Sequence, residues 1–289
     1  MTILIDQNTR AIIQGITGKV GSFQAKIMQE YGTHIAAGVT PGKGGIEIYG
    51  IPVFNFVNEA VEKYKPNAAF CFVPSRFVRD AALEVIRSRI PLLIITSEGV
   101  PDTDMLDILH YARIKGVRVI GPDTPGVISP GVCKLGVHPH TMFKKGSVGV
   151  LSKSGALSYE ICKNLTENNI GQSTVVGIGG GPIWGSRQKE ILELFFDDAD
   201  TKVVVLLGEV GGTMEMEAAD YIKANPKKPV ISLIVGRNAP AGAQMGHAGA
   251  IIEGKEGTAK YKIKALRNAG AYIASSPKEL IQIAKKLGL

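Results

Sequence analysis

Cysteine is scarce in this sequence: its 289 residues include only Cys71, Cys133 and Cys162. The three are far apart, and neither a Cys-x-x-Cys pair nor a mixed cysteine–histidine cluster offers the ligands of a metal site. An odd number of scattered cysteines also gives no disulfide framework. We therefore expect no metal site, and reduced, mostly buried thiols in a cytoplasmic protein.

Long apolar runs and blocks of charge are missing as well. No apolar run is long enough to span a membrane, and the first residues lack the basic region and apolar core of a signal peptide, so we expect no membrane association. The net charge is +7, but the basic residues form no cluster of the kind that binds nucleic acid, and we expect no such partner. A spread positive charge favours small polyanions such as phosphorylated cofactors. A basic solvated surface is an equally good explanation.

Aromatic residues make up only 6% of the chain, whereas glycine occurs 35 times. Abundant glycine suits a fold with many tight turns between strands and helices. Short β-rich runs alternate with helical patterns from residue 10 onward. The predicted strands are 11–14, 35–39, 68–73, 92–96 and 117–120, and the predicted helices are 22–31, 57–63, 76–89 and 104–115. Such alternation predicts βαβ units and a parallel sheet, that is, an α/β fold.

Residues 121–131 interrupt the alternation, because three prolines stand there among glycines. Proline at that density argues against a helix or a central strand, so we predict a linker or a structured loop. The alternation then restarts, with predicted strands at 148–151, 173–178, 202–207 and 230–235 and helices at 155–168, 188–196, 214–224, 260–269 and 277–286. We predict two α/β domains, 1–124 and 147–289, joined by a connecting segment at 125–146.

Three loops of the first half follow predicted strands. Gly15, Gly18 and Gly21 lie between the first strand and the first helix, where free N–H groups can receive a phosphate. This spacing differs from the Gly-x-Gly-x-x-Gly of dinucleotide folds, so a plain tight turn is an equal alternative. The loops at 40–45 and 96–99 add a lysine and hydroxyl groups. Loops at the carboxyl ends of neighbouring parallel strands converge on one crevice, where this fold class binds ligands.

The second half carries a histidine between glycines. His247 follows Gly246 and precedes an apolar run, which predicts an accessible imidazole able to carry a phosphoryl group. Glu209, at the end of a predicted strand, could accept a ring N–H. The simpler alternatives are a histidine that only contacts backbone and a glutamate that caps a helix. Small-residue turns at 152–155 and 177–182 each predict a helix start able to bind an anion.

Three motifs occur in one order along the chain: Gln14–Gly18, Gly38–Gly45 and Met245–Ile252. With them the sequence resembles, nearly end to end, the α subunits of succinyl-CoA synthetases, the acyl-CoA ligases that pass a phosphoryl group through histidine. The resemblance implies a Rossmann-like CoA-binding domain followed by a flavodoxin-like parallel α/β domain.

The resemblance also implies roles for individual residues. His247 matches the phosphorylated histidine, Glu209 the carboxylate that orients it, and Tyr159 a residue that binds the carboxylic acid substrate. Two helix starts, near Ser154–Gly155 and near Gly181–Pro182, match those that hold the phosphohistidine, so Ser154, Gly155 and Gly181 are the expected phosphate-stabilising residues. The expected CoA-binding residues are Thr17, Gly18, Lys19, Val20, Lys43, Thr96, Ser97 and Glu98.

A partner is implied by the same resemblance. The family has a β subunit with an ATP-grasp nucleotide site for ATP or GTP with Mg²⁺, and it assembles as αβ or α2β2. Nothing in this chain resembles an ATP-grasp fold, so catalysis should need that partner. The reaction implied is succinate, CoA and NTP to succinyl-CoA, NDP and phosphate, through a phosphohistidine and an acyl phosphate.

The chain departs from the family's usual pattern at several positions. No acidic residue stands between Gly181 and Pro182, and the other departures are Gln24, Asp123–Thr124, Lys153, Trp184 and Ala243–Gln244. Several of them surround the expected acyl and phosphoryl sites. They keep open the same mechanism on citrate or malate, and a non-catalytic CoA-binding regulatory protein.

Overall fold

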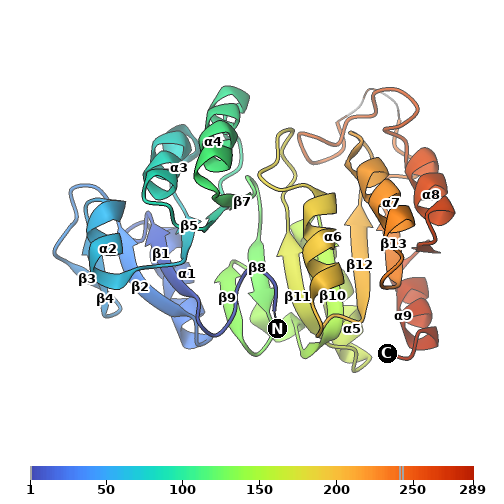
Figure 1. Cartoon of the computed structure of the whole chain (residues 1–289), viewed down its shortest axis with the longest axis horizontal. Coiled ribbons are helices and arrows are strands. Elements are labelled where there is room, and N and C mark those ends of the chain that lie inside the picture. Colours follow the sequence, from blue (N-terminus) through green and yellow to red (C-terminus); the bar gives the residue numbers. More distant parts are fainter. Residues whose placement is uncertain (1, 241, 243) are drawn as a thin grey trace.

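The computed structural model describes residues 2–240, 242 and 244–289 and contains two seven-stranded sheets side by side (Figure 1). The elements, in chain order, are β1 (Arg10–Gln14), α1 (Lys19–Glu30), β2 (His34–Val39), β3 (Glu47–Ile48), β4 (Ile51–Phe54), α2 (Val57–Tyr64), β5 (Ala68–Cys71), η1 (Ser75–Phe77), α3 (Val78–Arg87), β6 (Leu92–Ile95), α4 (Asp102–Lys115), β7 (Arg118–Ile120), β8 (Gly126–Ser129), β9 (Cys133–Gly136), η2 (His140–Met142), β10 (Lys145–Ser152), α5 (Gly155–Glu167), β11 (Gln172–Gly177), α6 (Gln188–Asp197), β12 (Val203–Gly208), α7 (Met214–Ala224), β13 (Val230–Ile234), α8 (Ala259–Asn268), β14 (Tyr272–Ala274) and α9 (Pro277–Lys286).

The first sheet has the strand order β3-β4-β2-β1-β5-β6-β7, and every pair except β3–β4 is parallel. Without β3 this is the 3-2-1-4-5-6 order of a Rossmann fold. Strands such as β5 and β6 are buried along their whole length, because helices cover both faces of a parallel sheet. The prediction of a Rossmann-like first domain is confirmed.

The second sheet has the order β14-β13-β12-β10-β11-β8-β9. Its first five strands are parallel and follow the 2-1-3-4-5 order of flavodoxin-like folds. Alternate residues of β12 enter two different apolar clusters: Leu206 packs in the cluster of α6, α7 and α8, and Val205 in that of α5 and α9. Helices therefore cover both faces, with α6 and α7 on the face turned to the viewer in Figure 1. The flavodoxin-like prediction is also confirmed.

The interpretation of residues 121–131 as a linker or loop is wrong in part. β8 lies inside this segment and pairs antiparallel with both β11 and β9, so it is an internal strand. Pro125 and Pro130 stand just outside the strand on either side. Proline removes only its own N–H from a ladder, so prolines that flank a strand leave its hydrogen bonds intact. The segment 125–146 thus contributes two strands to the second sheet.

The helix start expected near Gly181–Pro182 is wrong: α6 begins at Gln188, the first residue of the helix that the apolar pattern predicted at 188–196. The residues before it cross toward the end of the first sheet: the Gly185 N–H donates to the Gly121 carbonyl at 2.7 Å, and the Ser186 hydroxyl to the Val119 carbonyl at 2.8 Å. These tertiary hydrogen bonds hold the glycine-rich loop outside helical geometry. Glycine pays the largest backbone entropy in a helix, which also disfavours an early start.

The two halves are joined by hydrogen bonds as well as by the chain. The hydroxyl of Thr33, after α1, donates to the Lys134 carbonyl at 2.7 Å and accepts from the Lys134 N–H at 3.0 Å. Cys71, Cys133 and Cys162 are buried and free, as predicted. No helix in the described part of the chain has both the length and the apolar stretch needed to cross a membrane.

Candidate functional site

His247 lies in the long loop between β13 and α8, at the carboxyl edge of the second sheet. The loop folds back on itself through a bridge between Gln244 and Ile251, and the Met245 N–H donates to the Ala250 carbonyl at 3.0 Å. Gly246 has a φ of +83°, which a residue with a side chain adopts only with strain. The compact turn presents His247 at its tip.

The imidazole of His247 meets the carboxylate of Glu209, which follows β12. Nδ1 of the ring lies 2.8 Å from Oε2 of Glu209. The ring is 27% exposed and the carboxylate 8%. Because an ionised carboxylate can only accept, Nδ1 carries the hydrogen, and Nε2 keeps its lone pair. The structure brings these two predicted residues together, and Glu209 does not cap a helix: the N-cap of α7 is Thr213.

Charges around the ring set its protonation. The hydrogen bond that the ring donates to Glu209 raises the pKa of His247; burial opposes this effect, and the charge of Asp123 adds to it. Asp123 lies at the end of the first sheet in a left-handed conformation, with φ +55°. Burial raises the pKa of the Asp123 carboxyl, and the neighbouring Glu98 charge raises it further. A neutral nucleophilic ring therefore becomes more populated as the pH rises.

A glycine-rich loop packs directly against the imidazole of His247. A Cβ at Gly180 would lie 2.4 Å from Cγ of His247, so only glycine allows the backbone this close. The Gly249 N–H donates to the Gly180 carbonyl at 3.2 Å, and the Trp184 indole N–H to the Gly179 carbonyl at 3.0 Å. Gly181 directly follows the residue in contact with the ring. The backbone there is a loop held by tertiary contacts and not a helix start.

The second expected anion site is a true helix start. Ser154 is the N-cap of α5 and its hydroxyl accepts from the Leu157 N–H at 3.3 Å; Gly155 is the first helical residue. The positive end of the helix dipole lies here. Tyr159 follows one turn later, and its hydroxyl oxygen lies 3.7 Å from the position of a Cβ at Gly155. Burial raises the pKa of Tyr159 to about 12, so the phenol is a hydrogen-bond donor at neutral pH.

One buried histidine escaped the sequence analysis. His138 is 1% exposed, and neither ring nitrogen has a hydrogen-bond partner in the described structure. Its ring packs edge-on against Phe143 and Tyr159. Burial and the charge of Lys134 lower the pKa of His138 to about 3, so the ring is neutral. His138 stands in the segment Val137-His138-Pro139-His140, which matches no motif by which the sequence could have identified a buried ring.

A buried charge cluster also escaped prediction. Lys153, Glu215 and Lys262 are each at most 2% exposed, with Glu215 between the two lysines. The sequence does hold a signal for one of them: Ala259, Lys262 and Leu266 recur at helical spacing and are the buried residues of α8. A lysine on the apolar face of a helix indicates a buried charge with a purpose.

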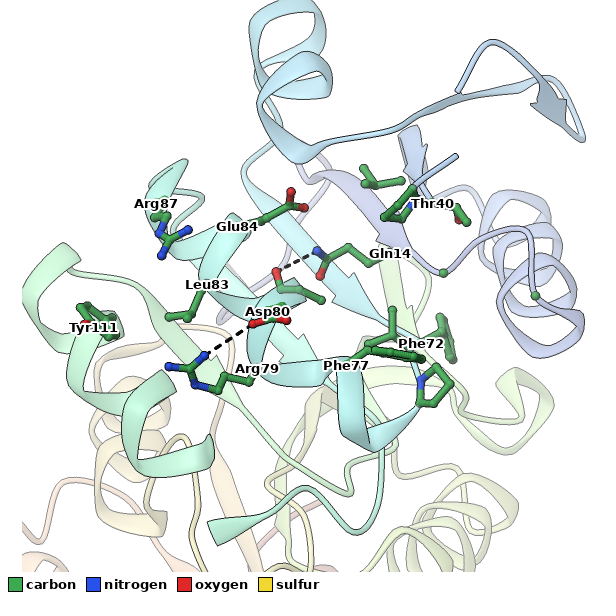
Figure 2. Close-up of a pocket in the computed structure, with 17 residues that line it drawn as sticks. Gln14, Thr40, Phe72, Phe77, Arg79, Asp80, Leu83, Glu84, Arg87 and Tyr111 are labelled. Atoms are coloured by element: carbon green, nitrogen blue, oxygen red, sulfur yellow. Dashed lines mark hydrogen bonds and ion pairs between the residues drawn. The ribbon is translucent and has the colours of Figure 1, made fainter. Parts of the chain in front are cut away.

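The first sheet holds a cavity of about 850 Å³ at the ends of its strands (Figure 2). Gly15 and Gly18 line it, as does Thr40, whose hydroxyl lies 3.3 Å from that of Thr17. Figure 2 shows Gln14, Thr40 and Phe72 on strand ends, across from Arg79, Leu83 and Arg87 on α3. The first two predicted loops therefore meet at one cavity, walled by apolar side chains and edged by charged residues of both signs: two arginines with Asp80 and Glu84.

The other expected CoA residues lie around the cavity and do not line it. Lys19 and Val20 begin α1, which Gly18 caps, and Lys43 is exposed on the loop after β2. Glu98 lies in the third loop, on the side of Asp123.

The third loop connects the cavity to the histidine. The Ser97 hydroxyl donates to the carbonyl of cavity-lining Val73 at 2.5 Å, and the Thr96 hydroxyl to the Thr124 carbonyl at 2.9 Å. The Asp123 N–H donates to the Ser97 carbonyl at 3.1 Å. Asp123 in turn acts on His247 through its charge. A series of hydrogen-bonded residues therefore leads from the cavity to Asp123, whose charge reaches the imidazole.

No group of three or more histidine, cysteine or acidic side chains gathers for a metal ion among the residues that the structure describes. Of the departures from the family pattern, Asp123, Lys153 and Trp184 lie at the histidine site. Nζ of Lys153 is 5.2 Å from the centre of the Trp184 ring. The Gln24 side-chain carbonyl is buried without a partner in the described part. Ala243 falls outside the described residues.

Known protein families match the two parts of the chain that hold these two sites. The CoA binding domain family matches residues 6–99, and the CoA-ligase family matches residues 151–272. The α subunit of an ADP-forming succinate–CoA ligase from Aquifex aeolicus is 46% identical over 99% of this chain and 95% of its own length. The corresponding protein of Methanothermobacter thermautotrophicus is 49% identical over 99% of this chain and 98% of its own.

Solved structures show the same fold. An ATP citrate lyase from Methanosaeta concilii superimposes with a TM-score of 0.88 and 26% identity, over 99% of this chain and 50% of that chain. This chain therefore spans half the length of that enzyme. A dinucleotide-forming acetyl-coenzyme A synthetase from Ca. Korarchaeum cryptofilum gives a TM-score of 0.79 at 22% identity, over 97% of this chain and 61% of that chain, a likeness of fold alone.

Proposed function

This chain belongs to the family of succinate–CoA ligase α subunits, and we propose from that premise that it is the α subunit of an NDP-forming acid–CoA ligase. Its reaction is succinate, CoA and NTP to succinyl-CoA, NDP and phosphate. The observation that carries this proposal is the 2.8 Å hydrogen bond between His247 and Glu209, which leaves Nε2 of the ring free as a nucleophile.

Phosphoryl transfer takes place in two steps at His247. Nε2 attacks the γ-phosphorus of NTP, the bond to the NDP oxygen breaks, and Glu209 stabilises the positive charge that the ring acquires. A carboxylate oxygen of the acid then attacks the same phosphorus, which gives an acyl phosphate and restores the neutral ring. The close approach of Gly180 and the start of α5 at Ser154 and Gly155 favour phosphate beside the ring.

Thioester formation completes the reaction. The CoA thiol sulfur attacks the carbonyl carbon of the acyl phosphate, phosphate leaves, and the thiol proton passes to solvent or phosphate.

The 850 Å³ cavity of the first sheet is the CoA site that we propose. The positions that match the family's are Thr17, Gly18, Lys19, Val20, Lys43, Thr96, Ser97 and Glu98. The bonded series from Val73 through Ser97 and Asp123 toward His247 supports a route for the thiol between the two sites. We propose that the CoA-binding domain ends at residue 124.

The nucleotide belongs to a partner in this proposal. Relatives that share 46–49% of the sequence are named α subunits, and we infer a β subunit with an ATP-grasp domain that binds ATP or GTP with Mg²⁺. The assembly is αβ or α2β2. The reduced, buried state of the three cysteines supports a cytoplasmic location.

Succinate is the acid that the relatives favour. The citrate-cleaving enzyme shares only 26% of the sequence, against 46–49% for the succinate–CoA ligases. Tyr159 is the proposed contact to the acid. A non-catalytic regulatory role would leave the pairing of His247 with Glu209 unexplained. Burying a carboxylate costs free energy, and a catalytic use of the pair accounts for that cost.

Nucleotide turnover with different acids tests the function. The chain, purified with its β partner, should release NDP in the presence of NTP, CoA and succinate, and His247→Asn should abolish this release. Citrate and malate serve as parallel substrates. Turnover with one of them and not with succinate would correct the acid, whereas CoA binding without turnover on any acid would contradict the enzyme and favour the regulatory protein.

A further inference from the structure

Beneath the loop that carries Glu209 lies the buried charge cluster of Lys153, Glu215 and Lys262. Nζ of Lys153 lies 2.9 Å from Oε1 of Glu215, and Nζ of Lys262 lies 2.5 Å from Oε2. The three come from the turn after β10, the first turn of α7 and the middle of α8. Two ammonium groups share one carboxylate, so the cluster has an excess of one positive charge. Burying charged groups costs free energy even when they are paired, which argues for a task beyond packing.

Two members of the cluster hold the backbone of Glu209. Nζ of Lys262 donates to the Glu209 carbonyl at 2.9 Å and also to the Gly211 carbonyl. Oε1 of Glu215 accepts from the Glu209 N–H at 3.3 Å. With its bond to Glu215, the ammonium of Lys262 uses all three of its donors. Both peptide groups that flank the Glu209 side chain are therefore fixed while its carboxylate reaches His247.

The third member reaches the other wall of the site. Nζ of Lys153 lies 5.2 Å from the ring centre of Trp184, whose indole is bonded to the Gly179 carbonyl of the glycine loop. The charge of Lys153 acts on the imidazole, since it lowers the pKa of His247 against the stronger effect of Glu209. The excess positive charge thus lies within electrostatic range of the ring. At short range in a protein, one unit charge changes such an equilibrium by about tenfold or more.

Glu215 stays ionised between the two lysines. Burial acts to raise the pKa of Glu215, but the ammonium groups of Lys153 and Lys262 outweigh burial and keep it below its ordinary value. The packing leaves room for the carboxylate only because residue 208 is glycine: a Cβ there would lie 2.8 Å from Oε1 of Glu215.

We propose that Lys153, Glu215 and Lys262 are positioning residues of the phosphoryl site. Lys262 and Glu215 fix Glu209 against Nδ1 of His247, and the excess positive charge of the cluster favours the phosphorylated ring over the free ring. This inference rests on the proposed phosphorylation of His247 and adds to it the residues that set its equilibrium.

Two substitutions separate charge from positioning. Lys153→Met and Lys262→Met each remove one ammonium and leave a neutral lysine–glutamate pair, so neither strands an unpaired buried charge. Both remove the excess positive charge, but only Lys262→Met removes the bonds to Glu209 and Gly211. Lys153→Arg keeps the charge and is the conservative control.

The phosphorylation equilibrium of His247 measures the effect of the cluster's excess positive charge. With the β partner at a fixed ratio of ATP to ADP, the ratio of phosphorylated to free chain should fall in both methionine variants by a factor on the order of ten. Lys153→Arg should stay within about twofold of the wild type, because the charge is kept. Ratios unchanged in both folded methionine variants would overturn the electrostatic part. Absence of label in the wild type would instead contradict the proposed function itself.

The Nδ1–H proton of His247 shows whether Glu209 is held in position against the ring. Its ¹⁵N-resolved NMR signal, protected by the bond to Glu209, should persist in Lys153→Met and disappear by exchange in Lys262→Met. If Lys262→Met does not fold, Gly208→Ala replaces it, because it keeps all three charges and displaces the Glu215 carboxylate. A protected signal that persists in both Lys262→Met and Gly208→Ala, or in Gly208→Ala alone when the other variant does not fold, would overturn the positioning part.

Discussion

At the scale of single residues, the partnership of His247 with Glu209 decides the chemistry of this protein. Glu209 fixes the hydrogen on Nδ1 and raises the pKa of the ring. The first effect exposes Nε2 as the nucleophile, whereas the second holds more of the ring in its protonated, unreactive form at neutral pH. Glu209 thus orients the ring for attack but lowers the fraction of His247 that is neutral and reactive.

Glu209→Gln should separate these two effects. Only the neutral ring attacks, so phosphorylation becomes faster as the pH rises through the pKa of His247. Removing the carboxylate charge lowers that pKa, and the midpoint of the pH profile should move to lower pH. The plateau rate should fall by about 10²-fold or more, because the amide no longer stabilises the positively charged ring. Initial rates of labelling across pH measure both quantities.

Asp123→Asn is the matched control for that experiment. Its charge also raises the pKa of His247, but it makes no hydrogen bond to the ring in the described structure. The midpoint should therefore move in the same direction while the plateau falls less than in Glu209→Gln. Equal losses of plateau in both variants would show that the hydrogen bond to Nδ1 has no special role.

Gly180→Ala tests the close packing of the glycine-rich loop against the His247 ring. A methyl group there would lie 2.4 Å from Cγ of His247, whereas at Gly181 the nearest atom would be 3.5 Å away. We expect Gly180→Ala to displace the ring and to lower the labelling rate by about 10²-fold, as a misplacement of about 1 Å can. Gly181→Ala should lose much less. A Gly180→Ala variant as active as Gly181→Ala would contradict the close approach.

At the scale of helices and strands, the sequence predicted long periodic elements well and short ones poorly. Helices α7 and α9 have the bounds that their apolar periodicity predicted. The strands β3, β4, β8, β9 and β14 were missed. Each has at most four residues, too few for alternation to be visible, whereas the equally short β5 and β6 stand in longer apolar runs. Prolines at 122, 125 and 130 concealed β8 further, although none lies inside it.

The site shows the same division. Motifs identified His247 and Glu209, which the fold brings together. The helix start expected at Gly181 failed because tertiary bonds from Gly185 and Ser186 hold the loop, and local sequence does not encode them. Lys153, Glu215 and Lys262 come from three elements, so their cluster exists only after folding.

His138, between η2 and β9, should make the protein sensitive to acid. Its pKa is about 3 in the folded state and about 6.5 when unfolded. The unfolded chain therefore binds the proton first as the pH falls below about 6.5, and stability is lost between there and about pH 3. At about pH 5 this amounts to about 2 kcal/mol.

His138→Leu removes that loss. It also removes two unpaired buried nitrogens, which adds about 1–3 kcal/mol of stability at neutral pH. Denaturant unfolding at about pH 7 and about pH 5 should show the variant more stable at both values and its advantage larger at the lower. The exposed His110→Leu is the control. An advantage that does not grow at low pH would contradict the burial of a neutral ring.

At the scale of the whole molecule, the two sheets divide the work. The first sheet holds the cavity and the second holds the histidine, and loops from both meet at residues 96–98 and 121–124. Binding of CoA and phosphorylation of His247 should therefore be separable.

Gly21→Ala tests this separation. Its Cβ would lie 2.2 Å from the Gly15 carbonyl oxygen, so the first loop must shift from the cavity. We expect the CoA dissociation constant to rise by about tenfold or more, which corresponds to about 1.4 kcal/mol, while labelling of His247 from ATP continues. His247→Asn should show the reverse pattern. Loss of labelling in folded Gly21→Ala would mean that the two sites act as one.

The most direct test of the whole account is the phosphorylation of His247 itself. The chain and its β partner are incubated with γ-³²P-labelled nucleotide in the absence of CoA and acid, and the protein is then treated with acid or alkali. We predict label on this chain that acid removes and alkali preserves, and that is absent from His247→Asn. Label that persists in His247→Asn, or a wild-type chain that takes up none beside an active β partner, would contradict the account.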